Sequence, residues 1–297
     1  MNGVLLIDKS SGPTSHDVVA SVRRILGQKR CGHTGTLDPF ATGLMMLCLG
    51  RATRLARFLS GADKTYVATI RFGYATDTFD RTGKPVGPIA LHSPDPEELA
   101  RTLAGFVGAQ MQRPPAFSAK KIGGKRAYEL ARAGESVSPK PVEVTIRSLE
   151  LLELDGATAR LEVTVSSGTY IRSLAHDVGK RLGCHAHLSE LRRTRVAAFS
   201  VSHAVTIETL EREGPLGALL TPNEALRGLP LVRVGAEVAK RLAHGHPPRF
   251  DELVGEDLSA AADTDFVRLV GPEGELLAVG EPDRARGIVR LAVVWNE

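Results

Sequence analysis

The chain has 297 residues and a formal net charge of +4, from 38 Lys and Arg against 34 Asp and Glu. Apolar residues make up 42% of the sequence, which allows a substantial core and excludes a wholly disordered chain. The longest apolar run, residues 44–49, is far shorter than the ~20 residues that a membrane-spanning helix needs. The weak positive charge excludes a histone-like protein, but it excludes neither nucleic acids nor small acidic molecules as partners.

Charge is unevenly distributed along the chain. Residues 230–297 hold 8 Lys or Arg and 12 Asp or Glu (net −4), so residues 1–229 hold the remaining 30 and 22 (net +8). We therefore expect a polyanionic partner to meet the first part. Three widely spaced cysteines form no disulfide framework, and the first residues lack the basic region of a signal peptide. Both features predict a reducing, cytoplasmic setting.

The first third of the chain predicts a strand, a helix and an irregular segment. Residues 4–7 favour a buried strand. Ser15 is a helix-capping residue type, and the apolar residues within 18–26 follow at helical spacing. Residues 31–39 are rich in glycine, and Asp38 precedes a proline, which favours an extended backbone there.

The middle of the chain predicts two strands, a helix and a hairpin around a basic segment. Residues 65–72 alternate between apolar and polar, and residues 96–107 form an amphipathic helical pattern. Residues 113–132 contain six basic residues and one acid. Residues 142–154 and 159–165 flank an Asp-Gly pair, which is a strong hairpin signal.

The last third predicts a helix, a basic strand and a small separate module. Residues 171–182 carry one apolar stripe, and residues 188–201 favour a strand with three arginines. A boundary is predicted within residues 214–230, followed by a short helix at 236–243. Three further strands are predicted near residues 266–270, 276–279 and 288–294. The whole is a mixed α+β chain with much antiparallel pairing.

Two groups of residues suggest chemistry, and each has a simpler interpretation. His33 and Asp38 share the glycine-rich segment, where glycines let a backbone approach a ligand closely. That segment could equally be a turn in which Asp38 caps the next helix; it is not a phosphate-binding P-loop, because no Gly-Lys-Ser/Thr follows. Arg172 begins a predicted helix and can pair with a carboxylate, or it can be a surface cation.

The sequence gives little support for a zinc site or a serine hydrolase. Cys184, His185 and His187, with His176 nearby, match no standard zinc spacing. A serine hydrolase would need a Gly-x-Ser-x-Gly turn, which is missing. The basic runs at 113–132 and 192–195 could follow a phosphate backbone or be solvated faces.

Several motifs in order over residues 1–210 resemble those of one family. The longest is GHTGTLDPFATGL at residues 32–44. The others are GVLLIDK at 3–9, Gly12 with TS at 14–15, DKTY at 63–66, TDT at 76–78 with Asp80 and Gly83, PP at 114–115 with SAK at 118–120, GTYIRSL at 168–174 and LRRT at 191–194. Together they resemble the bacterial tRNA pseudouridine-55 synthases of the TruB family. Two positions depart from the family pattern: Ser10 stands where a proline is usual, and Phe117 where relatives often carry tyrosine.

The resemblance implies an α+β pseudouridine synthase fold, with a mixed, largely antiparallel sheet flanked by helices and loops. A small β-rich module similar to the PUA type would follow. In domain terms, we expect a catalytic domain over residues 1–220 and the PUA-like domain over residues 230–297. Residues 113–135 would form a mobile basic loop that closes on RNA.

The resemblance also implies a reaction: isomerisation of a uridine to pseudouridine at position 55, in the T-arm of tRNA. The base is flipped out, the glycosidic bond is cleaved, and the base turns and rejoins through carbon, without cofactor or metal. Asp38 would be the catalytic carboxylate. Arg172 would pair with it and lower its pKa by about 1–3 units, which keeps it ionised. Tyr66 would stack on the flipped base and act in removing the C5 proton.

The remaining implied contacts are with RNA. His33 would occupy the vacated space or touch the backbone, and Ile171 and Leu191 would form apolar walls. The other implied RNA-binding residues are Lys9, Lys64, Lys120, Tyr170 and Arg193. The implied partner is tRNA, with no membrane and no protein partner for a monomeric enzyme. Two alternatives stay open: a non-catalytic RNA-binding protein on this scaffold, and a small-molecule enzyme such as a nucleoside hydrolase.

Overall fold

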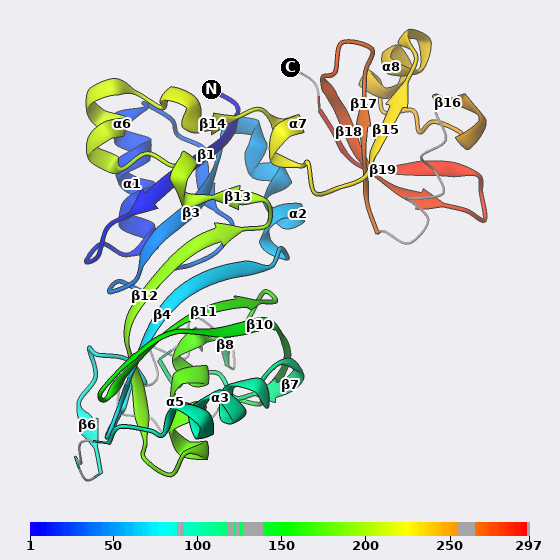
Figure 1. Ribbon diagram of the computed structural model, residues 1–297. Coiled ribbons are helices and arrows are strands. Elements are labelled where there is room, and N and C mark those ends of the chain that lie inside the picture. Colours follow the sequence, from blue (N-terminus) through cyan, green and yellow to red (C-terminus); the bar gives the residue numbers. More distant parts are fainter. Residues whose placement is uncertain are drawn as a thin grey trace.

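The computed structural model describes residues 1–87, 89, 92–117, 121–122, 125–126, 139–254 and 265–295. Lys120 and most of the predicted mobile loop lie outside these residues. The described chain forms a long curved sheet with helices at both ends, and a smaller sheet to one side (Figure 1). It is the mixed α+β arrangement that the sequence predicts.

The large sheet has the strand order β14-β1-β3-β12-β4-β11-β10-β7, with β2 paired to β3 and β13 to β12. All its pairings are antiparallel except that of β12 with β3. Its strands are β1 (Gly3–Lys9), β2 (Cys31–His33), β3 (Thr42–Leu49), β4 (Lys64–Phe72), β7 (Gly108–Gln112), β10 (Val142–Asp155), β11 (Thr158–Val165), β12 (Ala186–Val196), β13 (Phe199–Ser200) and β14 (Leu219–Leu220). The alternation predicted for residues 65–72 appears in β4, whose even-numbered residues face the core.

Helices cover the two ends of this sheet, and β4 and β12 run from one end to the other (Figure 1). The helices are α1 (Ser15–Ile25), α2 (Ala56–Ser60), α3 (Pro96–Ala104), α5 (Ile171–Arg181), α6 (Ile207–Glu213) and α7 (Pro222–Ala225), with 3-10 turns at Gly50–Leu55, Val201–His203 and Leu216–Ala218. Two short hairpins lie beside the sheet: β5 (Ala75–Thr76) with β6 (Pro85–Val86), and β8 (Lys121–Ile122) with β9 (Lys125–Arg126). None of the helices in the described ranges combines the length and hydrophobicity of a membrane span.

The N-cap of helix α1 lies one residue before the predicted cap, Ser15. Thr14 is the N-cap: its hydroxyl accepts from Asp17 N at 3.1 Å, and the Asp17 carboxylate accepts from Thr14 N at 2.8 Å. Ser15, the predicted cap, is buried and forms a different pair of bonds. Its hydroxyl donates to Leu37 O at 3.0 Å and accepts from Leu37 N at 2.9 Å. Ser15 therefore ties the helix to the loop that carries Asp38.

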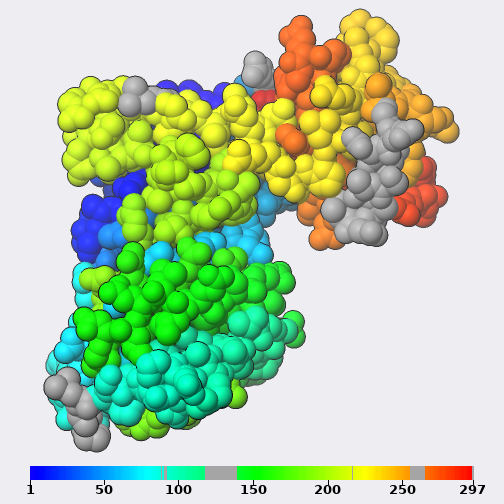
Figure 2. All heavy atoms as spheres, viewed as in Figure 1, coloured from blue at the N-terminus to red at the C-terminus, as the bar shows by residue number. Residues whose placement is uncertain are grey.

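The smaller sheet follows the order β16-β15-β17-β18-β19. Its elements are β15 (Leu231–Val234), α8 (Ala236–Ala243), a 3-10 turn at Phe250–Glu252, β16 (Leu253–Val254), β17 (Val267–Val270), β18 (Leu276–Asp283) and β19 (Ile288–Val294). It has a core of its own around Leu242, Leu269 and Val289. The space-filling view shows this module projecting to one side, away from the α3–α5 end of the large sheet (Figure 2).

The module is fastened to the large sheet's body through α2 and the turn before it. Phe58 and Phe266 stack edge to face with ring centroids 4.9 Å apart. Arg54 donates to Val294 O at 3.0 Å, and Arg57 donates to Ala292 O at 2.9 Å. Side chains of β18 and β19 thus join the larger core.

Candidate active site

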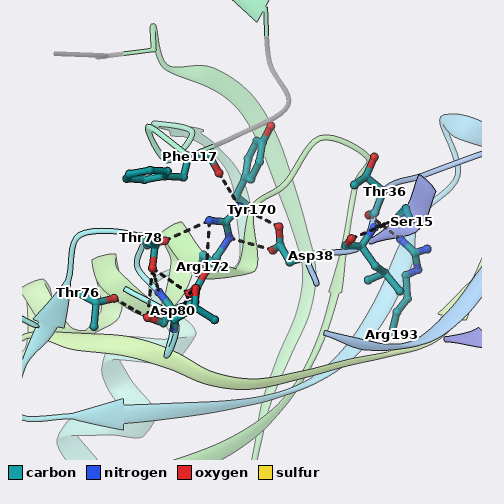
Figure 3. A network of polar contacts seen from close by, with 12 residues as sticks. Ser15, Thr36, Asp38, Thr76, Thr78, Asp80, Phe117, Tyr170, Arg172 and Arg193 are labelled. Carbon is teal, nitrogen blue, oxygen red and sulfur yellow. Dashed lines mark hydrogen bonds and ion pairs between the residues drawn. The ribbon is translucent and has the colours of Figure 1, made fainter. Parts of the chain in front are cut away.

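Three segments distant in sequence meet at one point above the large sheet. The loop between β2 and β3 carries Asp38, the first turn of α5 carries Arg172, and the turn between β5 and β6 carries Asp80. Figure 3 shows Arg172 at the centre, between the two carboxylates. The sequence predicts the first two as partners and assigns no role to the third.

Arg172 and Asp38 are in direct contact. Arg172 Nη2 donates to Asp38 Oδ1 at 3.0 Å, and Arg172 Nε lies 2.9 Å from Asp38 Oδ2. Arg172 is only 5% exposed, whereas the Asp38 side chain is 31% exposed. The guanidinium is therefore a buried, fixed support, and the carboxylate it holds remains open on one side to a ligand. Opposite charges in such geometry bind more strongly than neutral hydrogen-bonding groups.

The rest of the Arg172 guanidinium is also occupied. Nη1 donates to Thr78 O at 3.2 Å and lies 3.4 Å from Asp80 Oδ2. Nη2 donates to Phe117 O at 3.0 Å. The contact with Phe117 uses a main-chain oxygen, so the missing tyrosine hydroxyl at this position does not affect it. Because the planar guanidinium of Arg172 has partners along its edges, its orientation is fixed.

Asp80 is a residue of the family motif to which the sequence interpretation gave no role. Its Oδ1 accepts from Thr78 Oγ1 at 2.9 Å and from Thr82 N at 2.9 Å, while Oδ2 faces Arg172. The signal that could have revealed it is the Thr-x-Asp-x-Thr spacing, because a carboxylate between two threonines is well suited to close a tight turn. Both oxygens of this buried carboxylate are thereby bonded or paired.

The net effect on the pKa of Asp38 differs from the predicted one. Arg172 lowers this pKa, as expected for an adjacent cation, but burial raises it more strongly, and the nearby Asp80 carboxylate adds to the rise. The pKa of Asp38 therefore lies above its ordinary value. The prediction weighed the attraction of the arginine and left out the cost of burying the charge.

Two buried cations hold the backbone of the Asp38 loop through hydrogen bonds to its carbonyl oxygens. Lys9 Nζ donates to Pro39 O at 3.0 Å and to Ala41 O at 2.6 Å. Arg193 donates to Gly35 O at 3.2 Å, to Thr36 O at 3.3 Å and to Leu44 O at 2.7 Å. Figure 3 shows Arg193 and Ser15 gathered at this loop. The main chain on both sides of Asp38 is thus fixed by side chains from β1, α1 and β12.

Three of the predicted phosphate ligands are buried in this arrangement. Lys9 and Arg193 are 1% and 2% exposed, and the ammonium of the buried Lys64 donates to the main-chain oxygens of residues 60 and 62. Their donors point at carbonyl oxygens rather than toward solvent, where a phosphate would lie. Burial lowers the pKa of Lys9 and that of Lys64 to about 8 each. Both remain protonated at pH 7.

The end of the loop requires a glycine. Gly43 has a φ of +105°, in the region that disfavours other residues. A Cβ at Gly43 would stand 2.2 Å from Arg193 O, because β12 lies directly alongside β3 in a parallel pairing. This close approach brings the Arg193 side chain under the loop.

The predicted base-stacking residue lies on the same face of the sheet as Arg193. Tyr66 of β4 is opposite Arg193 of β12, and Ala68 is opposite Leu191, so these side chains share a face. Tyr66 and Leu191 are both mostly buried in the large core, as is Ile171 at the start of α5. The predicted apolar walls therefore come from this core.

Tyr170 and His33 flank the site. Tyr170 precedes α5, and its main chain is clamped by Gln112, which donates to Tyr170 O at 3.0 Å and accepts from Tyr170 N at 2.8 Å. His33 ends β2 and meets the ring of His16 edge to face, with centroids 5.7 Å apart. Burial, His16 and Arg193 lower the pKa of His33, so its ring is neutral at pH 7. Lys120 is not among the described residues.

The side chains gathered here are those of a site for acid–base or nucleophilic chemistry. Across the described ranges, no three His, Cys, Asp or Glu side chains gather as a metal site. What the geometry provides is one accessible carboxylate on a fixed cation, above a rigid loop. Such a carboxylate can attack an electrophilic carbon or accept a proton.

Comparison with known proteins assigns a family to this arrangement. Residues 23–171 match the model of the TruB family pseudouridylate synthase N-terminal domain, and residues 172–226 match that of the tRNA pseudouridylate synthase B C-terminal domain. The chain is 43% identical to a tRNA pseudouridine synthase B of Solibacter usitatus (95% of this chain, 96% of the relative). It is 42% identical to that of Syntrophotalea carbinolica (100% and 99%).

Solved structures agree with the sequence relatives. A chain in an H/ACA RNP bound to a substrate RNA containing 2'-deoxyuridine superposes with a TM-score of 0.77 at 25% identity, covering 99% of this chain and 85% of that one. A chain in a Cbf5-Nop10-Gar1 complex gives a TM-score of 0.74 at 27% identity, covering 98% and 84%. Both the fold and the motifs are therefore those that the resemblance implied. The chain belongs to the TruB family of pseudouridylate synthases.

Proposed function

We propose that this enzyme converts the uridine at position 55, in the T-arm of tRNA, to pseudouridine, with Asp38 as the catalytic carboxylate. Relatives that match nearly the whole chain carry the name tRNA pseudouridine synthase B, which supports tRNA as the substrate. The observation that carries the proposal is the Asp38–Arg172 pair: a partly exposed carboxylate on a buried guanidinium.

The reaction conserves atoms. The N1–C1′ bond breaks, the uracil turns, and C5 bonds to C1′ while C5 gives up its proton and N1 gains one. An ionised Asp38 can begin this sequence by attacking the sugar or the base, or by taking the C2′ proton. Arg172 keeps that carboxylate in place through each step. The reaction balances without a redox step or an added group.

The uridine must leave its stack before it can reach Asp38, and unstacking costs a few kcal/mol. Tyr66 and Leu191 offer an aromatic ring and an apolar wall for the extruded base. His33 is the group we assign to the vacated space, because its neutral ring can stack in RNA without carrying a charge. Lys9 and Arg193 act through the Asp38 loop that they hold, and Lys64 acts through the turn before β4, where it binds the main-chain oxygens of residues 60 and 62. Phosphate contacts belong to exposed cations and to Lys120.

The deciding experiment measures product in a T-arm transcript by carbodiimide labelling, because pseudouridine and uridine have equal mass. After incubation with wild-type protein, the carbodiimide should label the transcript at position 55. Asp38→Asn should bind the transcript and form no product. Equal product from Asp38→Asn would overturn the assignment of the carboxylate, and labelling at another uridine would overturn the assignment of position 55.

The same assay separates the alternatives. A non-catalytic RNA-binding protein would bind the transcript and never label it. A nucleoside hydrolase would turn over free uridine, with little dependence on salt. We expect no turnover of free uridine, and an affinity for the transcript that falls steeply as salt rises.

A further inference from the structure

An aromatic pair joins α5, the helix that carries Arg172, to the β5–β6 turn, which carries Asp80. The rings of His176 and Phe79 are stacked, with centroids 4.0 Å apart and an interplanar angle of 16°. His176 follows Arg172 by one turn of α5, so both side chains leave the same face of the helix. Phe79 is the residue between Thr78 and Asp80, the two partners of Arg172 in the β5–β6 turn. The pair therefore joins the helix of the arginine to the turn that the arginine binds.

Phe79 holds a backbone conformation that is unfavourable for an aromatic residue. Its φ is +62°, in the left-handed region, where a side chain crowds the following carbonyl. Such a conformation persists where surrounding contacts hold it, and it is common at functional sites. Here Phe79 N donates to Thr76 O at 3.2 Å, and Phe79 O accepts from Leu188 N at 2.9 Å. The stack on His176 is the side-chain part of that support.

The conformation of Phe79 decides where the arginine's partners point. Thr78 O and the Asp80 carboxylate stand on either side of this one residue, at 3.2 and 3.4 Å from Arg172 Nη1. A change in φ at Phe79 would move one partner relative to the other. Arg172 would then lose part of the support that aims its Nε and Nη2 at Asp38.

We propose that the stacked Phe79–His176 pair is a positioning element for catalysis: it locks the Thr78–Asp80 turn against α5 and so aims Arg172 at Asp38. This inference rests on the proposed function of Asp38. Neither ring touches the reacting atoms, so both are positioning residues.

His176 serves in this pair as a flat, uncharged ring. Its Nδ1 is buried and has no hydrogen-bond partner among the residues that the structure describes. Burial, with Lys180 and His185 nearby, lowers the pKa of His176, so the ring is neutral at pH 7. An aromatic ring without nitrogen should therefore replace it, and a side chain without a ring should not.

The test compares His176→Ala, His176→Phe and Phe79→Gly in the full-length enzyme on a T-arm transcript. Glycine adopts positive and negative φ freely, so Phe79→Gly removes the ring and widens the range of backbone conformations open to the turn. His176→Ala and Phe79→Gly should lower the single-turnover rate by about tenfold to hundredfold with unchanged RNA affinity, as expected for a displaced catalytic group. His176→Phe should restore the wild-type rate.

A second readout separates positioning from general loss of stability. Because Arg172 lowers the pKa of Asp38, a loosened arginine should shift the acid limb of the rate–pH profile to higher pH in His176→Ala. Phe58→Ala is the matched control, because it removes an aromatic pair far from the site, at the interface with the small module. It should lower the melting temperature and leave both the rate and the acid limb unchanged.

Two outcomes would overturn the inference: a wild-type rate and acid limb in His176→Ala, or a His176→Phe variant as slow as His176→Ala. Should Phe79→Gly fail to fold, the two His176 variants carry the test alone. Asp38→Asn, assayed in parallel, keeps this result apart from the proposed function. An active Asp38→Asn refutes the proposed function, whereas an inactive Asp38→Asn beside a fully active His176→Ala refutes the positioning role only.

Discussion

The large sheet's body and the small C-terminal module differ in where many of their positive charges are paired: the body buries three cations around its site, and the module pairs most of its cations at the surface. In the body, Lys9, Arg172 and Arg193 are buried and bind main-chain oxygens or the site carboxylates. Among the described residues of the module, five Lys or Arg lie within 4.0 Å of a carboxylate, mostly at the surface. The net charges of +8 for residues 1–229 and −4 for residues 230–297 therefore do not show how many cations of each part are free to bind RNA. Part of the body's charge organises the active site instead of facing RNA.

The two arrangements also differ in energy. Removing one partner of a buried ion pair costs about 3–5 kcal/mol, because the other charge is left without compensation. An exposed pair contributes about 0–1 kcal/mol and is screened by salt. Substitutions of the buried cations of the body should therefore affect folding and catalysis together, and substitutions of exposed cations, in the body or in the module, should affect neither strongly.

The largest effect is expected for Arg172→Ala. It leaves Asp38 and Asp80 near each other without the cation that separates them, so one of the two should bind a proton. We expect the unfolding free energy to fall by about 3–5 kcal/mol. The single-turnover rate at pH 7 should fall by at least about a thousandfold, while RNA affinity changes little. Chemical denaturation and a single-turnover assay measure the two quantities.

Arg147→Ala is the matched control for that substitution. Arg147 pairs with Asp63 at 3.1 Å, but its side chain is 54% exposed. Its loss should cost at most about 1 kcal/mol and leave the rate unchanged. Equal effects of the two arginine substitutions would remove the distinction between buried and exposed cations.

The second prediction concerns pH. Because the pKa of Asp38 is raised in the folded state, the folded enzyme holds this proton more tightly than the unfolded chain does. The contribution of Asp38 to stability is thus fully present below its unfolded pKa of about 3.9 and is lost as pH rises through the folded pKa. Activity needs the ionised form, so the rate should increase over the same interval by about tenfold per pH unit. As pH rises through this interval, the rate should increase and the melting temperature of the wild type should fall relative to that of Asp38→Asn, which cannot ionise there. A rate that falls with rising pH would contradict this assignment.

The third prediction concerns Lys9→Met, which keeps the length of the side chain and removes its donors. Pro39 O and Ala41 O would lose their buried partner, at a cost of about 1–3 kcal/mol. The loop that carries Asp38 should loosen, so the rate should fall further than the affinity for RNA. A phosphate ligand would behave differently, because its loss lowers the slope of log affinity against log salt by about 1. An unchanged slope supports the structural role, and a lowered slope would restore the predicted phosphate contact.

The contrast between Lys9 and Asp38 shows how far the sequence alone reaches. Strand and helix positions follow from periodicity, and the motif around Asp38 points to the loop at the centre of the site. Whether a lysine at a strand end faces solvent or main-chain oxygens depends on segments 30 residues away, such as the loop at Pro39 and Ala41. The residues next to Lys9 in the sequence do not indicate that contact. The same applies to Asp80, whose partner Arg172 is supplied by a helix much later in the sequence.

The smallest effect is expected for Arg290→Ala in the C-terminal module. Arg290 lies 2.6 Å from Glu281, but its side chain is 52% exposed, so solvent and salt screen the pair. We expect the unfolding free energy to change by less than about 1 kcal/mol, and less again at high salt. Because Arg290 is already neutralised by acidic neighbours, the salt dependence of RNA binding should stay as in the wild type. A lowered salt slope in Arg290→Ala would show that the acidic module contributes a phosphate contact, and the contrast between the two parts of the chain would then no longer hold.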